Sequence, residues 1–322
     1  MTNWIAVGLC AGLAAAVLQA TVLYPSPVTM VAFYLSALPI FVVALGWGLS
    51  ATAVAGLSGC LAIAAVAGAK PAAAFLIAVA VPPAILSWLA LHSRPADEGP
   101  PLEGEPQVDG VQWYPEGRLV LWAAVIAGAL TSLAILLIAP SAESFRTTLE
   151  GLVSQMLTAM GEQVEREELD QMVALMTVLL PIAAASVWLL ATLVNMKLGA
   201  RILAAFKHSP RPWARFGALT FPRRAAWLLP LALAASMLPG IWGVIGSLFA
   251  AAIFTAFALA GLAVLHGLTE GMAARGPLLG GLYLALILLN WLMLVPLAVL
   301  TMLDMAFRMR ARTAANSPPP PE

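Results

Sequence analysis

Apolar residues follow one another along this chain in runs long enough to cross a lipid bilayer. A bilayer core about 30 Å thick needs about 20 apolar residues, because a helix rises about 1.5 Å per residue. Nine runs approach that length, at residues 3–24, 28–47, 48–68, 71–92, 118–139, 171–196, 221–238, 241–266 and 277–307. The pattern predicts an all-α polytopic bundle of about eight transmembrane helices, with the short seventh run as an irregular or re-entrant element.

Two polar insertions interrupt these runs and divide the chain. Residues 93–117 combine acidic residues with Pro and Gly and predict a flexible linker between a four-helix segment, 1–92, and a C-terminal membrane segment, 118–312. Residues 141–168 predict an amphipathic helix, because apolar residues recur every three or four positions. These are Phe145, Leu149, Leu152, Met156, Met160 and Val164. The stripe is interpreted either as lying in the lipid boundary of the outer interface or as covering a partner or a cavity mouth. Residues 313–322 predict a disordered tail.

Composition narrows the class of protein further. Apolar residues make up 61% of the chain and charged residues 10%, against roughly a quarter charged in an average soluble domain, which excludes a soluble enzyme. The formal net charge is zero, which argues against a nucleic-acid binder. Cys10 and Cys60 both lie inside apolar runs, and the three histidines are widely scattered. We therefore expect no metal site and no cofactor.

The basic residues are distributed asymmetrically and set the expected orientation. No acidic residue occurs between Asp170 and Glu270, yet residues 197–224 carry seven basic ones: Lys197, Arg201, Lys207, Arg211, Arg215, Arg223 and Arg224. Lys and Arg favour cytoplasmic loops, so this basic loop is predicted in the cytoplasm of a bacterial inner membrane. The orientation of the protein in the membrane explains most of the positive charge of this loop. The alternative is that Arg201, Arg211, Arg215, Arg223 and Arg224 bind anionic lipid headgroups or a cytoplasmic partner.

Small residues recur at every fourth position of two runs. They are Gly8, Gly12, Ala16 and Ala20 in the first run and Gly48, Thr52, Gly56, Cys60, Ala64 and Gly68 in the third. A face without bulky side chains lets two helix backbones approach closely in lipid. The ladders therefore predict helix docking, either inside the bundle or onto another membrane subunit.

Few polar groups lie within the apolar runs, and each is a candidate for helix contact or ligand binding. Gln19, Asn195 and Asn290 can hydrogen-bond across helices or contact a ligand. Asp304 precedes Arg308 by one turn, which predicts an interfacial ion pair at the end of the last run. The runs carry no acidic residue or lysine at mid-span, which argues against a proton pump.

Hydrolase motifs give little support for an enzyme. Gly56-Leu57-Ser58-Gly59 matches the motif around the nucleophile of rhomboid-type intramembrane proteases, and His266 ends a later run. The residues after His266 lack the rhomboid glycine spacing, and Ser58 belongs to the small-residue ladder region. Metalloprotease and P-loop motifs are not found in the sequence. We expect no enzyme, and an intramembrane serine hydrolase is the remote alternative.

The C-terminal half carries a family resemblance over about residues 195–310. Its residues are Asn195, Arg201, Phe221-Pro222-Arg223-Arg224, Trp227, His266-Gly267, Leu303-Asp304 and Arg308. This succession resembles the YybS-like bacterial membrane proteins, a domain of unknown function, although members often carry Gln-Gly at the position of His266-Gly267. That family is grouped by remote similarity with substrate-binding S-components of energy-coupling-factor importers. The resemblance implies docking of a transmembrane coupling subunit through the first helix, where the ladder from Gly8 to Ala20 lies.

Three functions follow from these patterns. The first is a small-molecule binding or transport component that works with an ATPase-driven partner, and the second is a structural or regulatory protein that docks other membrane proteins or lipid. The third is the hydrolase. Expected partners are membrane lipids and a second membrane subunit, with no nucleic acid.

Overall fold

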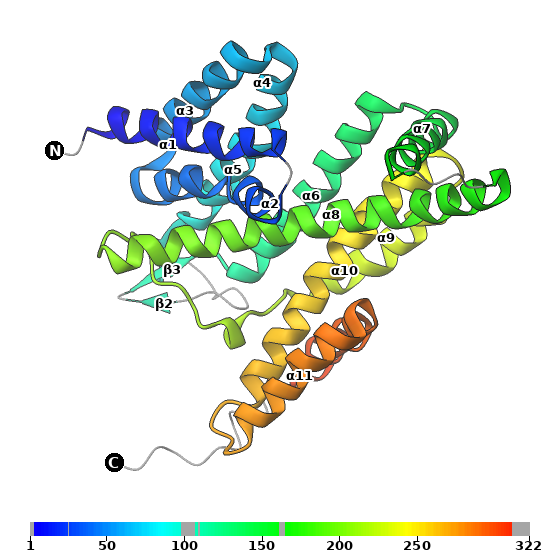
Figure 1. Ribbon diagram of the computed structural model, residues 1–322. Helices are drawn as coiled ribbons and strands as arrows, with labels where there is room; N and C mark the ends of the chain where they lie inside the picture. Colours follow the sequence, from blue (N-terminus) through cyan, green and yellow to red (C-terminus); the bar gives the residue numbers. More distant parts are fainter. Residues whose placement is uncertain (1–2, 25, 98–106, 109, 161–164, 311–322) are drawn as a thin grey trace. The chain divides into compact units, whose positions relative to one another are not determined.

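The structure is a computed structural model of the 322-residue chain and describes all residues except 1–2, 25, 98–106, 109, 161–164 and 311–322. Helices dominate it (Figure 1), which confirms the prediction of a polytopic all-α protein. Six helical segments of the described chain are long and apolar enough to cross a bilayer: Trp4–Leu23, Pro27–Ala67, Ala69–Ala90, Glu116–Ile138, Arg166–Ala205 and Ile241–Leu268. The chain divides into two compact units, Met1–Ala123 with Leu190–Pro222, and Ala124–Leu189 with Arg223–Glu322.

The first unit is built around a long central helix. It contains α1 (Trp4–Ala20), the 3-10 turn η1 (Thr21–Leu23), α2 (Pro27–Tyr34), α3 (Leu38–Ala67), α4 (Ala69–Phe75), the π turn η2 (Leu76–Ala80) and α5 (Val81–Ala90). α1 packs along one side of α3, and α4, η2 and α5 pack along it as well. Part of the core consists of buried apolar residues from these helices: Ala15, Ala16, Ile40, Ile63, Ala72, Phe75, Val79 and Ala80.

Helix breaks divide two of the predicted apolar runs in this unit. Run 28–47 forms α2 and the first part of α3, and α3 kinks at Gly48, whose φ of +79° lies where a side chain would be strained. In run 71–92, the π turn η2 ends at Ala80, and Pro82 and Pro83 follow in the first turn of α5. Proline has no backbone N–H, so the carbonyls one turn earlier lose their regular helical partners.

The predicted linker is ordered at both of its ends, which corrects the expectation of a flexible segment over 93–117. β1 (Ser93–Pro95), β3 (Val111–Trp113) and β2 (Gln107–Val108) form an antiparallel sheet in the order β1-β3-β2. Gln112 on β3 is buried, and its Oε1 accepts a hydrogen bond of 3.0 Å from Nε of Arg94. Most of the acidic middle of the linker lies outside the described residues.

The part of α8 (Arg166–Ala205) from Leu190 onward packs with the N-terminal segment in the first unit. A Cβ at Gly199 would lie 3.3 Å from Cβ of Phe41, and one at Gly46 would lie 2.9 Å from Leu203. The basic loop that follows α8, including the 3-10 turn η3 (Phe216–Ala218), belongs to this unit up to Pro222. The predicted domain boundary at residue 118 therefore does not coincide with the division of contacts.

The second unit is built around α10 (Ile241–Leu268), which is mostly buried. Its other elements are the later part of α6 (Glu116–Ile138), α7 (Ala142–Met160), the first part of α8, the 3-10 turns η4 (Arg223–Trp227) and η5 (Asn290–Met293), α9 (Leu228–Ser236), α11 (Arg275–Leu289) and α12 (Leu294–Phe307). α9 and α12 both pack on α10. Gly261 permits one of these contacts, because a Cβ there would overlap the backbone of Leu297.

The seventh and ninth predicted runs form helices that are too short to cross a bilayer individually. Run 221–238 becomes η4 and the nine-residue α9, and run 277–307 divides at η5 into α11, with 15 residues, and α12, with 14. Fifteen helical residues rise only about 22 Å, against a bilayer core of about 30 Å. The seventh run is thus irregular as predicted, and the last run is irregular too.

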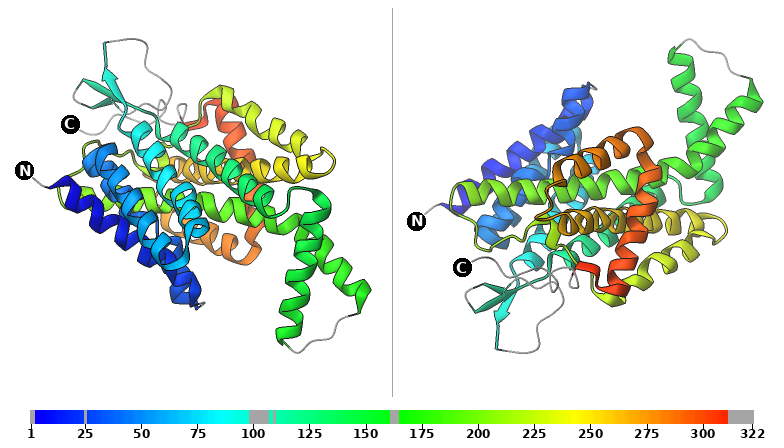
Figure 2. Two further views of the ribbon diagram at one scale, coloured as in Figure 1. Left: turned by 90° about the horizontal axis from the view of Figure 1, so that it is seen from above. Right: turned by 90° about the horizontal axis from the view of Figure 1, so that it is seen from below.

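The predicted amphipathic helix over 141–168 is present as α7 over Ala142–Met160, which forms a hairpin with the first turns of α8 (Figure 2). Val164 of the predicted stripe lies outside the described residues. Phe145 and Leu149 are buried against Val173 of α8. The predicted stripe is covered only in its first half, because Leu152 and Met156 are exposed.

Candidate functional site

The basic loop begins where α8 ends in a left-handed turn. Lys207 has a φ of +56°, its N–H donates to the carbonyl of Ala204, and the N–H of His208 donates to Leu203. This pattern satisfies carbonyls at the helix end. The ring of His208 lies 4.7 Å from that of Trp47 on α3, so the loop is held against the first unit from its first residues onward.

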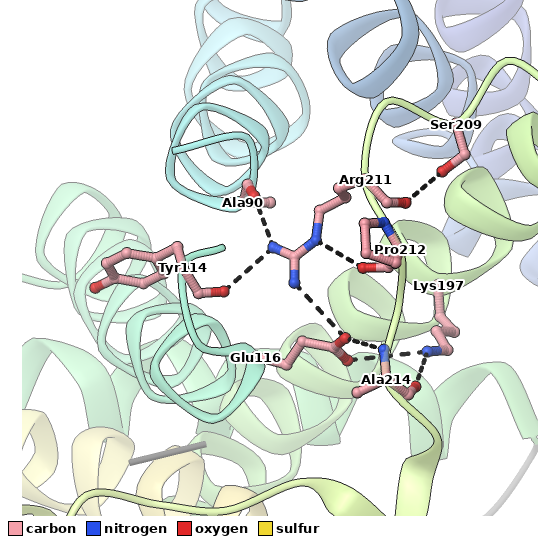
Figure 3. A network of polar contacts seen from close by, with 8 residues as sticks. All are labelled: Ala90, Tyr114, Glu116, Lys197, Ser209, Arg211, Pro212 and Ala214. Carbon is pink, nitrogen blue, oxygen red and sulfur yellow. Dashed lines mark hydrogen bonds and ion pairs between the residues drawn. The ribbon is translucent and has the colours of Figure 1, made fainter. Parts of the chain in front are cut away.

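Arg211 is the buried centre of the loop. Its Nη1 donates to the carbonyl of Ala90 at the end of α5 (2.6 Å) and to that of Tyr114 before α6 (3.2 Å), and its Nε donates to the carbonyl of Pro212 (3.3 Å). Nη2 lies 3.7 Å from Oε1 of Glu116 (Figure 3), which is an ion pair without a hydrogen bond. The side chain of Arg211 has no exposed surface, so these contacts replace its hydration.

Glu116, the first residue of α6, joins the arginine to the rest of the loop. Its Oε1 accepts a hydrogen bond of 2.6 Å from the N–H of Ala214, and its Oε2 lies 3.9 Å from Nζ of Lys197 on α8. Lys197 also donates to the carbonyl of Ala214 at 3.4 Å. One carboxylate thus binds two cations and a backbone amide, and Figure 3 shows these groups converging from α5, α6, α8 and the loop.

Two tryptophans complete the surroundings of the guanidinium. Cζ of Arg211 lies 4.6 Å from the ring centroid of Trp213 and 5.8 Å from that of Trp113 on β3. Burial lowers the pKa of the Arg211 guanidinium, and the negative charge of Glu116 opposes that shift. Arginine stays protonated in proteins, so the group acts as a fixed positive charge. We call Arg211 with Glu116, Lys197, Trp113 and Trp213 the Arg211 clasp.

The clasp holds segments of the first unit together. The donors and acceptors of its charged groups point at one another and at backbone carbonyls, and Arg211 is not exposed to a substrate. In the part of the chain that the structure describes, no group of three or more His, Cys, Asp or Glu is placed to hold a metal ion.

The structure therefore separates the five arginines that were predicted to form one lipid- or partner-binding site. Arg211 is buried in the clasp, which corrects its assignment to a lipid- or partner-binding surface, whereas Arg201 and Arg215 are exposed in the first unit. Arg223 and Arg224 are exposed too, but they lie in η4 of the second unit.

The candidate ligand-binding residues have different surroundings. Asn195 is buried, and its Nδ2 donates to the carbonyls of Tyr34 (2.7 Å) and Ala191 (2.8 Å), as expected for a contact between helices. Its Oδ1 and the Oε1 of Gln19 are buried without a hydrogen-bond partner among the described residues. Asn290 lies in η5, and its side chain is outside the described part.

The small-residue ladders pack inside the first unit. A Cβ at Gly8 would lie 2.7 Å from the carbonyl oxygen of Ala51 on α3, and one at Gly12 would overlap the backbone of Ala55. Ala16, from the same ladder, belongs to the buried core, and Ala20 ends α1 half-buried. The α1 face thus contacts α3, in agreement with the alternative of packing within the bundle.

The small-residue ladder of α3 also packs inside the first unit, except at its first and last glycine. Gly56 faces Ala80, whose Cβ would lie 3.2 Å from a Cβ at the glycine. Gly48 and Gly68 adopt positive φ values and have open space where a side chain would be. These two glycines therefore serve the helix breaks, and the docking role of Gly48 stays a prediction.

The predicted ion pair at the end of the last run involves a different arginine. Nη2 of Arg310 lies 2.6 Å from Oδ2 of Asp304, and Nε of Arg310 donates to the same oxygen at 3.0 Å. Arg308 adopts a left-handed conformation with φ of +50°, and its N–H donates to the carbonyl of Asp304. Because the helix ends at this turn, Arg310 rather than Arg308 is brought to the carboxylate.

The residues of the hydrolase hypothesis have separate partners. Oγ of Ser58 donates to the carbonyl of Ala55 at 3.1 Å, and Nδ1 of His266 lies 2.9 Å from the carbonyl of Leu262. Nε2 of His266 lies 3.1 Å from Oη of Tyr283. Ser58 belongs to the first unit and His266 to the second.

Sequence patterns do not single out three members of the clasp. Glu116 lies in the predicted linker, Lys197 is one of the seven basic residues counted for orientation, and Trp113 lies outside every predicted apolar run. One local signal was available: the segment Pro210-Arg211-Pro212-Trp213 fixes an extended backbone around an arginine beside an indole ring.

The fold defines a polytopic helical membrane protein, and a buried arginine joins the loop after α8 to the ends of other helices. The chain belongs to the family described as Predicted membrane protein (DUF2232), whose family model matches residues 116–305. No curated protein and no solved structure matches the chain.

Proposed function

We propose that this membrane protein is non-catalytic and has a structural or regulatory role, and that it binds anionic lipid headgroups where α8 ends. The observation that carries the proposal is an exposed apolar stripe that runs directly into exposed cations. On the basis of its positive charge, we assign this end of α8 to the cytoplasmic side of a bacterial inner membrane.

The apolar stripe follows one face of α8. Leu198, Ile202 and Phe206 are spaced four residues apart and are 36%, 37% and 80% exposed. Arg201 and Lys207 are exposed next to the last two of them. Apolar and aromatic side chains that end beside basic ones are typical of a helix leaving the bilayer at the headgroup level.

The Arg211 clasp supports the proposal because it limits the freedom of the chain that follows Lys207. Arg211 connects the loop to Ala90 and Tyr114, and Glu116 holds Ala214. Cations that are already held in place lose less conformational entropy on binding a phosphate than cations on a flexible loop.

Binding of a defined lipid tests the proposal. Each Lys or Arg near an anionic membrane surface contributes about 1 kcal/mol, so Arg201→Gln with Lys207→Gln should weaken phosphatidylglycerol binding by about 30-fold. Native mass spectrometry of the purified chain, with phosphatidylcholine as the neutral lipid, measures this change. Lys70→Gln, which removes an exposed lysine of α4, is the matched control. Equal retention of both lipids by the unmodified chain would contradict the proposal.

A second candidate function is a small-molecule binding component similar to importer S-components, as the YybS-like resemblance implies. This candidate is favoured by Oδ1 of Asn195, a buried acceptor that has no hydrogen-bond partner among the described residues and lies beside the break between α2 and α3. Buried polar atoms of this kind call for a water or a ligand donor. The ladder that includes Gly8 and Gly12 packs on α3, so a coupling subunit would have to dock on another surface.

Thermal stabilisation of the purified chain tests this second candidate. A panel of small amphipathic amides, amines and alcohols should include a compound that raises the unfolding temperature of the unmodified chain. The effect should be lost in Asn195→Leu, which removes the acceptor. A panel without any stabilising compound would count against this function.

A further inference from the structure

The hairpin formed by α7 and residues 166–176 of α8 carries an apolar stripe that its own unit covers only in part. Phe145 and Leu149 are buried at its base. Leu152 and Met156 continue the same stripe and are 56% and 60% exposed. In a soluble setting, two adjacent exposed side chains of this size favour an interaction site.

The length of α6 places the base of this hairpin at the edge of the bilayer core. α6 carries no charged residue from Leu119 to Ile138, and these residues rise about 30 Å, which is one hydrocarbon thickness. Ala139, immediately after α6, packs with Phe145 and Val173 of the hairpin. α7 therefore begins close to the membrane interface.

The pairing of the two helices directs α7 away from the membrane. Nη2 of Arg146 lies 3.1 Å from Oδ1 of Asp170, and Nη2 of Arg166 lies 3.7 Å from Oε1 of Glu150, so α7 runs antiparallel to the start of α8. The uncharged stretch of α8 begins only after Asp170. α7 thus follows the charged extension of a spanning helix outward, rather than lying flat in the lipid boundary.

The exposed residues consequently lie well outside the hydrocarbon. Leu152 is about 15 Å and Met156 about 21 Å along α7 from Ala142, at 1.5 Å per residue. Lipid chains do not reach this distance from the base of the hairpin. The interpretation of the stripe as a lipid-boundary surface therefore applies to its buried first half at most.

The charge of the hairpin indicates what covers the exposed half. Among the described residues 142–160 and 165–170 there are six acidic side chains and two basic ones, a net charge of −4. Glu165, Glu167 and Glu168 are exposed at the start of α8. A second copy of the hairpin and an anionic membrane surface are both repelled by this charge, whereas a basic segment is attracted.

We propose that Leu152 and Met156 form a docking surface for a basic, amphipathic segment of another protein outside the membrane. The apolar side of such a segment covers the two exposed side chains, and its Lys or Arg residues face the acidic start of α8. This assignment is independent of the lipid proposal for the other end of α8, because no residue is shared between the two surfaces.

A model peptide tests the surface directly. The full chain in phosphatidylcholine nanodiscs is titrated with a fluorescent amphipathic helical peptide of leucine and lysine, and the same peptide with glutamate in place of lysine serves as the comparison. We expect saturable binding of the lysine peptide only. Leu152→Ser with Met156→Ser should raise its dissociation constant at least tenfold, and Met272→Ser, which alters an exposed methionine outside the hairpin, should leave it unchanged.

A charge variant provides a second readout that does not depend on the apolar pair. Glu167→Gln with Glu168→Gln should weaken peptide binding several-fold and reduce its dependence on salt. Asp97→Asn, which removes an exposed carboxylate in the first unit, should change neither quantity. All the altered side chains are exposed, so the unfolding temperature of each variant should match that of the unmodified chain.

Several results would overturn the proposal. One is the absence of saturable lysine-peptide binding, or binding that is indifferent to both pairs of substitutions. Met156→Cys, in a chain with Cys10 and Cys60 replaced by alanine, tests the other occupants: a disulfide between two copies would assign the surface to self-association. Quenching of a fluorophore at that cysteine by spin-labelled lipid would assign it to the bilayer.

Discussion

Replacement of Arg211 by methionine isolates the contribution of the clasp to the order of the basic loop. Methionine has a similar reach and no charge, so the variant removes two hydrogen bonds to the carbonyls of Ala90 and Tyr114 and the ion pair to Glu116. It also removes the positive charge over Trp213. The backbone segments that the arginine joins come from α5, the entry to α6 and the loop, and Arg211 is the side chain that contacts all three.

The expected loss of free energy follows from the burial of the ion pair between Arg211 and Glu116. Removing one partner of a buried ion pair costs about 3–5 kcal/mol, because the other charge stays behind uncompensated. The Glu116 side chain is 17% exposed and keeps Lys197 and the N–H of Ala214, so we expect the lower end, about 3 kcal/mol. At 1.36 kcal/mol per factor of ten, the equilibrium for local opening of the loop should shift by about 150-fold.

Hydrogen exchange of the chain in nanodiscs measures this opening. The amide of Ala214 donates to Glu116 and reports the clasp itself, and peptides from the centre of α10 serve as an internal reference. Exchange of the loop amides should accelerate by the same factor, about 150-fold, in Arg211→Met, while the α10 amides keep their rates. If the exchange rate of the Ala214 amide in the variant stayed within about threefold of its rate in the unmodified chain, contacts other than the clasp would hold the loop in place.

A double substitution separates the ion pair from simple packing. Glu116→Gln should have little further effect in the Arg211→Met background, below about 1 kcal/mol, because its main counterion is already gone. Arg211→Lys should recover only part of the loss, since an ammonium lacks the planar fork that reaches two carbonyls and a carboxylate together.

The hydrophobic runs predicted the long helices well, because in lipid each span must be apolar over its whole length and hydrogen-bond its own backbone. They failed where backbone chemistry overrides hydropathy. The break between α2 and α3 and the π turn before Pro82 and Pro83 each lie inside a single predicted run, whereas the kink of α3 at Gly48 falls at the predicted boundary between two runs. Hydropathy alone therefore reports that a segment is in the membrane and not whether it crosses as one helix.

The Arg211 clasp escaped prediction for a different reason. Orientation rules count every arginine of a loop as a water-exposed charge, and only burial distinguishes Arg211 from Arg201. The partners of Arg211 lie 97 residues away at Tyr114 and 121 residues away at Ala90, so no local spacing connects them. The small-residue ladder was more informative, because it predicted close packing at Gly12 correctly, and only the packing partner had to come from the structure.

Further substitutions test the packing and the polar contacts elsewhere in the chain. In denaturant titrations, Gly12→Ala should lower the free energy of unfolding by about 3 kcal/mol or more, because the added Cβ overlaps the backbone of α3. Gly151→Ala is the control, because the space around Gly151 is open, and it should be neutral or stabilise α7 by up to about 1 kcal/mol. Asn195→Leu should cost about 2 kcal/mol in the same titrations, since two hydrogen bonds are lost. Asp304→Asn should release Arg310 and accelerate proteolysis after α12, because the ion pair fixes the chain where it leaves the helix. An unchanged cleavage rate would show that other contacts hold the end of the helix.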